Sequence, residues 1–265
     1  MIATVAILPP ALIDRYFYKS ISFWAWLFTG LALVLRHFSS FHLHETFGGI
    51  SEVQVLTRVS TILFYSFGVL NLILWARIRF SKAAVTRTVL IFITVFGLAA
   101  VVTDSLLYRP NLNPVWAQNL LIPLHFISAS LLLGGFLTGM IFGHWYLVNT
   151  DMPKKLLVTM AWVLIATLVF RVIAVVTTLE VTSIFIRPGV DFLENLTALQ
   201  GHGIFFWQRI LVGLAIPAVV VAMIWSTARI GSNQSATGIM YVAVAFVFIG
   251  ELVARYLFLL STIPL

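Results

Sequence analysis

The sequence has no cysteine and very few charged side chains. Without cysteine the chain forms no disulfide, holds no iron–sulfur cluster through thiolates of its own and attaches no c-type haem through a CxxCH motif. Charged residues make up 9% of the chain, against roughly 25% in ordinary soluble domains. Hydrophobic residues make up 61%, which is more apolar surface than a soluble core can bury. The composition therefore predicts a multi-pass membrane protein.

Several signatures of enzymes and receptors are also missing. No Walker A, HExxH or GxSxG motif occurs, so nothing favours nucleotide-dependent or soluble-type hydrolase chemistry. No lysine lies inside an expected span, which disfavours a retinal Schiff base. The first twenty residues lack a basic start and a small-residue cleavage site, and we interpret them as an interfacial segment rather than a signal peptide.

Long apolar runs predict an all-α fold, a polytopic bundle of about seven spanning helices, because a helix needs about 20 apolar residues to cross a membrane. The fourth run is longer than one crossing requires, so it starts later, near Pro123, tilts strongly or projects from the membrane. No internal repeat is visible, and residues 1–265 are expected to form one integral membrane domain. The expected spans are residues 20–37, 54–76, 84–107, 116–148, 156–179, 203–228 and 236–262.

The distribution of lysine and arginine predicts the orientation. With the N-terminus inside, nine basic residues fall in inner segments and three in outer ones, so we expect N-in and C-out in a bacterial or archaeal cytoplasmic membrane. Residues 38–53 and 180–202 then form long outer-face loops, the second with a short helix after Pro188. The net charge of +7 is thus a topology signal with some affinity for anionic lipid, not a nucleic-acid surface.

Ionisable side chains inside the expected spans are the main functional signal, because charge in hydrocarbon is costly and marks working sites. Under the predicted orientation they all fall in the outer half of the bilayer, and His202 lies just before the sixth span. Glu251 and Arg255 are four residues apart and are the first pair we expect. We predict that the ionisable side chains inside the spans, Arg58 aside, face the bundle interior. The candidate ligand site is Arg58, Asp104, His125, Arg171, His202, Arg209, Glu251 and Arg255.

This polar set has several interpretations. A structural network of ion pairs would hold the helices together without a ligand. The excess of arginine over acid instead favours a bound anion, such as a lipid phosphate, a substrate carboxylate or an acidic partner side chain. Histidine beside carboxylate favours proton handling and contact with a quinone. A single b-type haem is a further alternative, with His125 as one ligand and His37 or His202 as the other.

Two weaker patterns complete the set of candidates. The His-Leu-His-Glu run at 42–45, with His37 before it, carries metal-ligand residue types; in a strand, positions 42 and 44 would share a face, and a solvated loop is the favoured alternative. A small-xxx-small pattern in the fourth span predicts close helix packing, either as a central element or as a dimer face. The weak metal candidates are His37, His42, His44 and Glu45, and the packing glycines are Gly135, Gly139 and Gly143.

The closing run GELVARYLFLL, residues 250–260, resembles the ending of the membrane-anchor subunits of the dimethyl-sulfoxide-reductase and NrfD-like group. The resemblance implies a quinone site near the outer face and electron transfer to iron–sulfur partners. Those subunits usually have eight or more helices, and they have glycine where this chain has Ala254. Together the residues and the resemblance predict an integral membrane subunit of an electron-transfer complex, with a quinone-type or other amphipathic ligand and with lipids and other membrane or extracytoplasmic subunits as partners. A transporter or lipid-handling protein and a single-haem cytochrome remain alternatives.

Overall fold

The structure is a computed structural model that describes residues 1–46, 51–81, 84–109, 114–149, 152–186, 196–198 and 203–265. For residues 11, 38–46 and 51–52 it describes the backbone alone. The fold is all-α, since these residues form helices and no strand. Within them, seven helices are long and apolar enough to cross a membrane, which confirms the predicted class.

The helices group into two compact units, Met1–Tyr108 (unit 1) and Arg109–Leu265 (unit 2). The sequence predicted one domain. Composition does not mark the boundary, because helices that face lipid are apolar on their outer side whichever unit they belong to.

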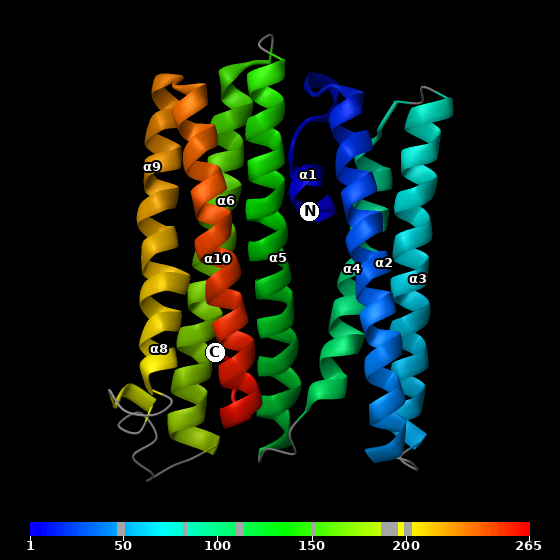
Figure 1. Ribbon diagram of the computed structural model, residues 1–265, viewed down its shortest axis with the longest axis vertical. Helices are drawn as coiled ribbons and strands as arrows, with labels where there is room; N and C mark the ends of the chain where they lie inside the picture. Colours follow the sequence, from blue (N-terminus) through cyan, green and yellow to red (C-terminus); the bar gives the residue numbers. More distant parts are fainter. Residues whose placement is uncertain (47–50, 82–83, 110–113, 150–151, 187–195, 199–202) are drawn as a thin grey trace. The chain divides into compact units, whose positions relative to one another are not determined.

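Unit 1 contains three spanning helices and a short N-terminal helix (Figure 1). α2 packs on α3, α3 packs on α4, and α1 contacts α4. The guanidinium of Arg87 holds this last contact by donating from Nε to the main-chain oxygen of Ala6 at 3.0 Å. The elements are α1 (Ile2–Ile7), η1 (Pro10–Leu12), α2 (Arg15–Thr46), α3 (Ser51–Phe80), α4 (Arg87–Ser105) and η2 (Leu106–Tyr108).

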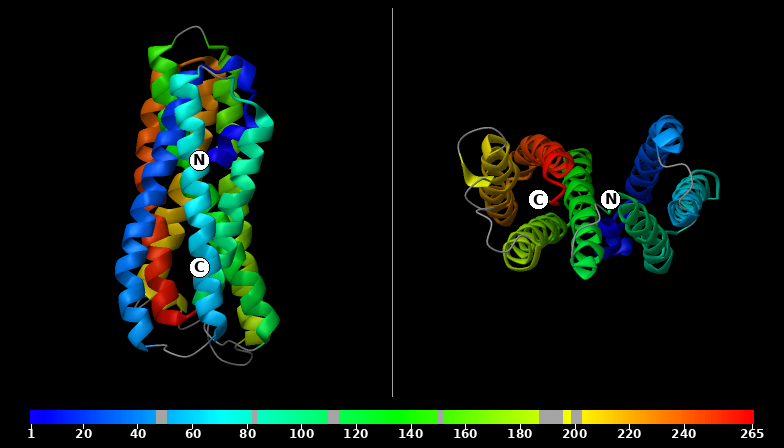
Figure 2. Two further views of the ribbon diagram at one scale, coloured as in Figure 1. Left: turned by 90° about the vertical axis from the view of Figure 1, so that its right-hand side faces the viewer. Right: turned by 90° about the horizontal axis from the view of Figure 1, so that it is seen from below.

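Unit 2 contains four spans in a closed ring. α5 contacts α6 and α10, and α9 contacts the same two helices, so the four enclose a common interior (Figure 2, right). α8, η4 and α9 together form one span, and its middle part, η4, is a π-helical turn. The elements are α5 (Val115–Val148), α6 (Lys154–Val181), the π-helical turn η3 (Thr182–Ile186), α8 (Gly203–Ile210), η4 (Leu211–Ala215), α9 (Ile216–Ile230) and α10 (Asn233–Ser261).

Local sequence explains where these helices begin and end. Pro114 and Pro153 stand immediately before α5 and α6, where a missing N–H costs nothing. α9 ends at Gly231, whose φ of 81° is a conformation that glycine adopts without strain. Many hydroxyl groups inside the spans donate to the carbonyl four residues earlier, as Ser22 does to Tyr18. Polar groups within an apolar helix are thereby satisfied without water.

The glycine stripe of α5 packs against other helices of unit 2. Gly135 and Gly139 face Leu164 of α6, and Gly143 faces α10. A Cβ added at Gly143 would lie 2.9 Å from Oγ1 of Thr237, which is closer than real Cβ atoms come. All three glycines are buried. The stripe thus makes α5 a central packing element of unit 2.

The connections differ from the prediction. α2 continues to Thr46 and α3 begins at Ser51, so the predicted loop 38–53 is helical over most of its length. Helix propagates far more easily than it nucleates, and an established span therefore extends through a polar segment. α5 begins at Val115 with Pro123 inside it, so the fourth span is one helix and does not start at this proline. The predicted loop 180–202 begins with the end of α6 and η3; Pro188 and the helix expected after it lie outside the described residues.

Candidate ligand site

Four of the predicted site residues meet in the interior of unit 2. His125 lies ten residues after the start of α5, while Arg171 and Glu251 lie ten residues before the ends of α6 and α10. At 1.5 Å per residue this is about 15 Å from the same end of three helices. Arg209 of α8 joins them, and all four side chains are buried. We call the polar core the set His125, Ser128, Arg171, Thr178, Arg209 and Glu251.

Arg171 is the centre of the polar core, and the protein satisfies all of its donors. Its Nε and Nη2 donate to the two carboxylate oxygens of Glu251 at 2.8 and 2.9 Å. Nη1 donates to Nδ1 of His125 at 2.8 Å and to Oγ of Ser128 at 3.1 Å. Nη2 also donates to the main-chain oxygen of Leu265 at 3.2 Å. The two-point pairing of Arg171 with Glu251 is the strongest geometry available to an arginine and a carboxylate. Together with the bonds to His125 and Ser128, it fixes α5, α6 and α10 to one another.

The hydrogen bonds of His125 determine its tautomer. Arginine has donors only, so Nδ1 of His125 accepts the bond from Arg171 and carries no proton. Nε2 then carries the proton, with Oγ1 of Thr178 at 2.6 Å and the main-chain oxygen of Ala174 at 3.1 Å. Thr178 donates its own hydroxyl proton to Ala174 at 3.0 Å, which leaves its oxygen free to accept. His125 is therefore a neutral imidazole with both ring nitrogens in use.

Arg209 is fully buried and only partly satisfied. Its Nη2 donates to Oε1 of Glu251 at 3.0 Å, whereas its Nε has no hydrogen-bond partner among the described residues. Nη1 lies 3.5 Å from the main-chain oxygen of Gly213. The residue four positions later, Pro217, has no N–H to donate to that oxygen. A buried donor without an acceptor is costly, and in native structures it usually indicates an unseen water, ion or ligand.

The space around Arg209 depends on two glycines of facing helices. Gly213 of η4 and Gly250 of α10 approach so closely that a Cβ added at Gly250 would lie 2.3 Å from the Cα of Gly213. A Cβ added at Gly213 would lie 2.7 Å from Nη1 of Arg209. The π-helical turn begins two residues after Arg209, and such turns are frequent at functional sites. The π-helical turn and the two glycines thus lie directly beside the guanidinium of Arg209.

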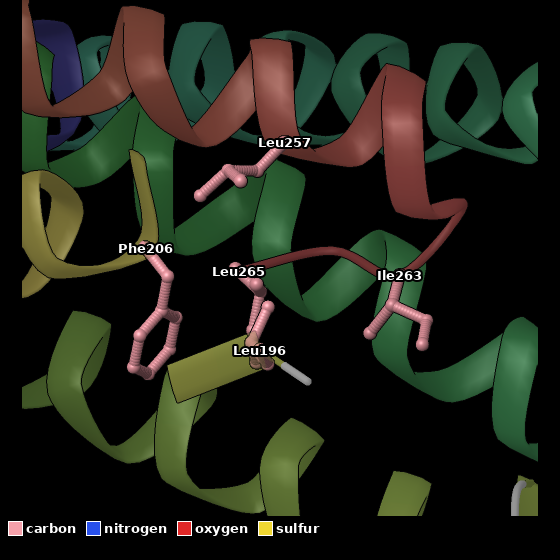
Figure 3. Close-up of a cluster of buried hydrophobic side chains, with 5 residues drawn as sticks. All are labelled: Leu196, Phe206, Leu257, Ile263 and Leu265. Carbon is pink, nitrogen blue, oxygen red and sulfur yellow. The ribbon is translucent and has the colours of Figure 1, made fainter. Parts of the chain in front are cut away.

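An apolar cluster lies against the polar core at Leu265. Figure 3 shows five buried side chains of one cluster, which come from α8, from α10, from the segment at 196 and from the residues after α10. Leu265 links this cluster to the polar core, because its side chain packs in the cluster while its main-chain oxygen accepts from Arg171. We call the tail cluster Leu196, Phe206, Leu257, Ile263 and Leu265.

Of the other predicted site residues, one lies beside the polar core, two lie in unit 1, and one is outside the described residues. Arg255 is half-buried, with its guanidinium 4.0 Å from the ring centroid of Phe126 on α5. Asp104 belongs to unit 1, where its carboxylate accepts from Nη1 of Arg36 at 2.5 Å. Arg58, also in unit 1, is exposed on α3. His202 lies outside the described residues. The polar core is therefore smaller than the predicted set.

Among the described side chains, the polar core offers no suitable ligand to a haem or a metal. His125 offers iron no free ring nitrogen, because Arg171 and Thr178 occupy both. No group of histidine, aspartate or glutamate side chains in the described part of the chain has metal-site geometry. His37 is exposed, and the side chains of His42, His44 and Glu45 lie outside the described residues. The backbone there is helical rather than the strand in which positions 42 and 44 would share a face.

Sequence reasoning missed several members of the site. Ser128 and Thr178 looked like ordinary hydroxyl residues of apolar spans, and nothing in their spacing marked them. Gly213 carried a usable signal, since the proline four residues later has no N–H to donate to its carbonyl. In unit 1, Arg36 was not among the predicted candidates, yet it forms the ion pair with Asp104.

Comparison of the chain with models of known protein families, with curated proteins and with solved structures finds no match. The site therefore has to be interpreted from its own chemistry.

Proposed function

We propose that the chain is an integral membrane subunit of an electron-transfer complex, and that unit 2 binds a quinone-type ligand beside the polar core. The observation that carries the proposal is the buried, unpartnered Nε donor of Arg209 next to Glu251. A quinone carbonyl is an acceptor that satisfies this donor without adding charge to a buried site. The seven apolar helices supply the lipid-soluble setting in which such a ligand moves.

The chemistry of quinones supports the same assignment. Oxidation of a quinol to a quinone releases two electrons and two protons, so its site needs groups that take up protons. Glu251 and His125 are such groups, and Arg171 links them by hydrogen bonds of 2.8 Å on either side. Because the chain has no cysteine, a partner subunit supplies the iron–sulfur centre that accepts the electrons.

Quinone titration tests the proposal. Purified protein is titrated with decylubiquinone, and binding is followed by quenching of tryptophan fluorescence. Arg209→Met removes the Nε donor, and we expect its affinity to fall about 10- to 100-fold, which is the usual effect of a charged hydrogen bond. Arg36→Met is the matched control, because it removes an ion-paired arginine from unit 1. Equal affinity of both variants, or no saturable quenching of the unmodified protein, contradicts the proposal.

The orientation belongs to the same proposal. The lysine and arginine bias favours N-in and C-out in a bacterial or archaeal cytoplasmic membrane, which places the polar core in the outer half. The absence of native cysteine makes single-cysteine labelling clean. Exposed positions on opposite sides serve as reporters: an impermeant maleimide should label Ala198→Cys in intact cells and Ser81→Cys only after permeabilisation. The reverse pattern would invert the orientation.

A second candidate function is the handling of anionic lipid. The observation in its favour is that two buried arginines, Arg171 and Arg209, share one carboxylate. A lipid phosphate would balance the excess positive charge. Exchange of fluorescent phosphatidylglycerol between proteoliposomes is the test, and loss of exchange in Arg171→Ala and Arg209→Ala, together with no quinone binding, would favour this function over the first.

A further inference from the structure

A stacked arginine lies at the other end of unit 2 from the polar core. Arg229, in the last turn of α9, follows Arg209 by twenty residues of the same span, which is roughly 30 Å along the helix axis. Its guanidinium carbon lies 4.5 Å from the ring centroid of Trp225. An arginine that stacks on an indole keeps its in-plane N–H donors available to an anion. The structure thus positions a guanidinium far from the candidate ligand site.

A surface hollow of about 220 Å³ lies beside this guanidinium. Its lining comes from the last turns of α9, namely Trp225, Ser226, Arg229 and Ile230. The last three are exposed, so the hollow opens at the outside of the helix bundle. Toward the middle of the span, Ser226 is followed at helical spacing by Met223 and Val219, which are exposed and apolar. The hollow therefore combines a cation and a hydroxyl group with an apolar strip.

Side chains of α6 place the hollow at the level of lipid headgroups. Trp162 packs edge-on against Trp225, with ring centroids 5.8 Å apart, and is itself exposed. Lys154, the first residue of α6, extends to the end of α9, because a Cβ added at Gly231 would lie 2.8 Å from its Nζ. Tryptophan is enriched where acyl chains meet headgroups, and basic residues lie just outside this level. The hollow thus lies at the boundary between headgroups and acyl chains.

The charge around the hollow is positive. No described carboxylate forms an ion pair with Arg229. The described acidic residues of unit 2 are Glu180 and Glu251, which lie in the far halves of α6 and α10, while Asp151 lies outside the described residues. Each lysine or arginine near the membrane surface favours an anionic headgroup by about fivefold in affinity. A zwitterionic headgroup gains less, because its amine offsets its phosphate.

We propose that this hollow binds one anionic phospholipid, with the phosphate against Arg229 and Ser226 and an acyl chain along Met223 and Val219. The site goes beyond the proposed function and does not depend on it, because it is separate from the polar core and needs no quinone. The lipid contacts α9 and, through Trp162, α6, so it holds these two helices together at this end.

Native mass spectrometry of the full chain in detergent tests the site. The protein is titrated with dioleoyl-phosphatidylglycerol and, separately, with dioleoyl-phosphatidylcholine, which has the same acyl chains and no net charge. We expect phosphatidylglycerol to bind at least about fivefold more tightly, and Arg229→Gln to lower its affinity about fivefold. Arg79→Gln is the matched control, because Arg79 also stacks on an aromatic ring in the last turn of a helix, 5.5 Å from Phe80, but belongs to unit 1.

Three results would overturn the proposal. Equal affinity for the two lipids removes the preference for an anion. Equal losses in Arg229→Gln and Arg79→Gln indicate a general attraction to surface charge. Release of the lipid by excess inorganic phosphate, but not by sodium chloride of the same ionic strength, indicates a site for a free anion. Lys154→Gln, which removes the second cation, is measured in parallel, so that poor folding of one variant does not decide the result.

Discussion

Arg171 and Glu251 stand eighty residues apart in the chain and form a two-point ion pair, with N–O distances of 2.8 and 2.9 Å. Their side chains are 2% and 4% exposed. Two charges at this depth are tolerable only because each neutralises the other and nearly every remaining donor is satisfied. The same carboxylate also serves Arg209, so two buried cations depend on Glu251.

Loss of this anion should be the most damaging single change in unit 2. Glu251→Gln leaves Arg171 and Arg209 buried without a counter-charge, and we expect the free energy of unfolding to fall by about 3–5 kcal/mol. Arg209→Gln keeps the two-point pair and should cost less, about 1.5–3 kcal/mol. Thermal unfolding in detergent, followed by scanning fluorimetry, measures both.

Asp104→Asn in unit 1 is the control for this comparison. The side chains of Asp104 and its ion-pair partner Arg36 are each about one-fifth exposed. Loss of this ion pair should therefore cost only about 0–1 kcal/mol. If Glu251→Gln and Asp104→Asn unfold at the same temperature, the buried carboxylate does not have the role assigned to it.

Part of the position of the site was predicted from the sequence, but its pairing was not. Threading the chain with the N-terminus inside put His125, Arg171 and Glu251 in one half of the membrane, and in the structure each lies ten residues from an end of its own helix. The i,i+4 rule identifies neighbours within one helix, so it predicted an ion pair between Glu251 and Arg255. The structure instead pairs Glu251 with arginines of α6 and α8. α5 and α6 are apolar on nearly every side, so their sequences do not indicate which face meets which helix.

The tautomer of His125 is a direct consequence of its partners. Because Arg171 donates to Nδ1, we expect only Nε2 to carry a proton near neutral pH. Solid-state NMR of protein with ¹⁵N-labelled histidine should show one neutral, Nε2-protonated ring that is missing from His125→Asn. The exposed His144 provides the reference signal of a solvated ring. A doubly protonated or Nδ1-protonated ring at position 125 would contradict the hydrogen-bond assignment.

The contact between Gly213 and Gly250 should tolerate no side chain. Gly250→Ala would bring a Cβ within 2.3 Å of the Cα of Gly213, a backbone atom that cannot turn aside. We expect it to force η4 and α10 apart and to lower stability by about 1–3 kcal/mol or more. Gly238→Ala on the same helix meets nothing within 4 Å and should instead stabilise by about 0.5–1 kcal/mol. Changes of opposite sign in unfolding temperature would support the close approach, and a gain in both variants would refute it.

Thr262, whose φ of 62° is left-handed, gives the last prediction. A left-handed conformation costs an ordinary residue about 1–2 kcal/mol, and glycine avoids this cost. Glycine also has more freedom in the unfolded chain, which offsets about 0.5–1 kcal/mol of the gain. Thr262→Gly should therefore raise the free energy of unfolding by up to about 1 kcal/mol. Ser261→Gly is the control, since Ser261 ends α10 and its hydroxyl accepts from Ile263. That substitution removes a hydrogen bond without relieving strain and should destabilise. If both glycine variants unfold earlier than the parent in the same fluorimetric assay, the reversal at Thr262 carries no strain.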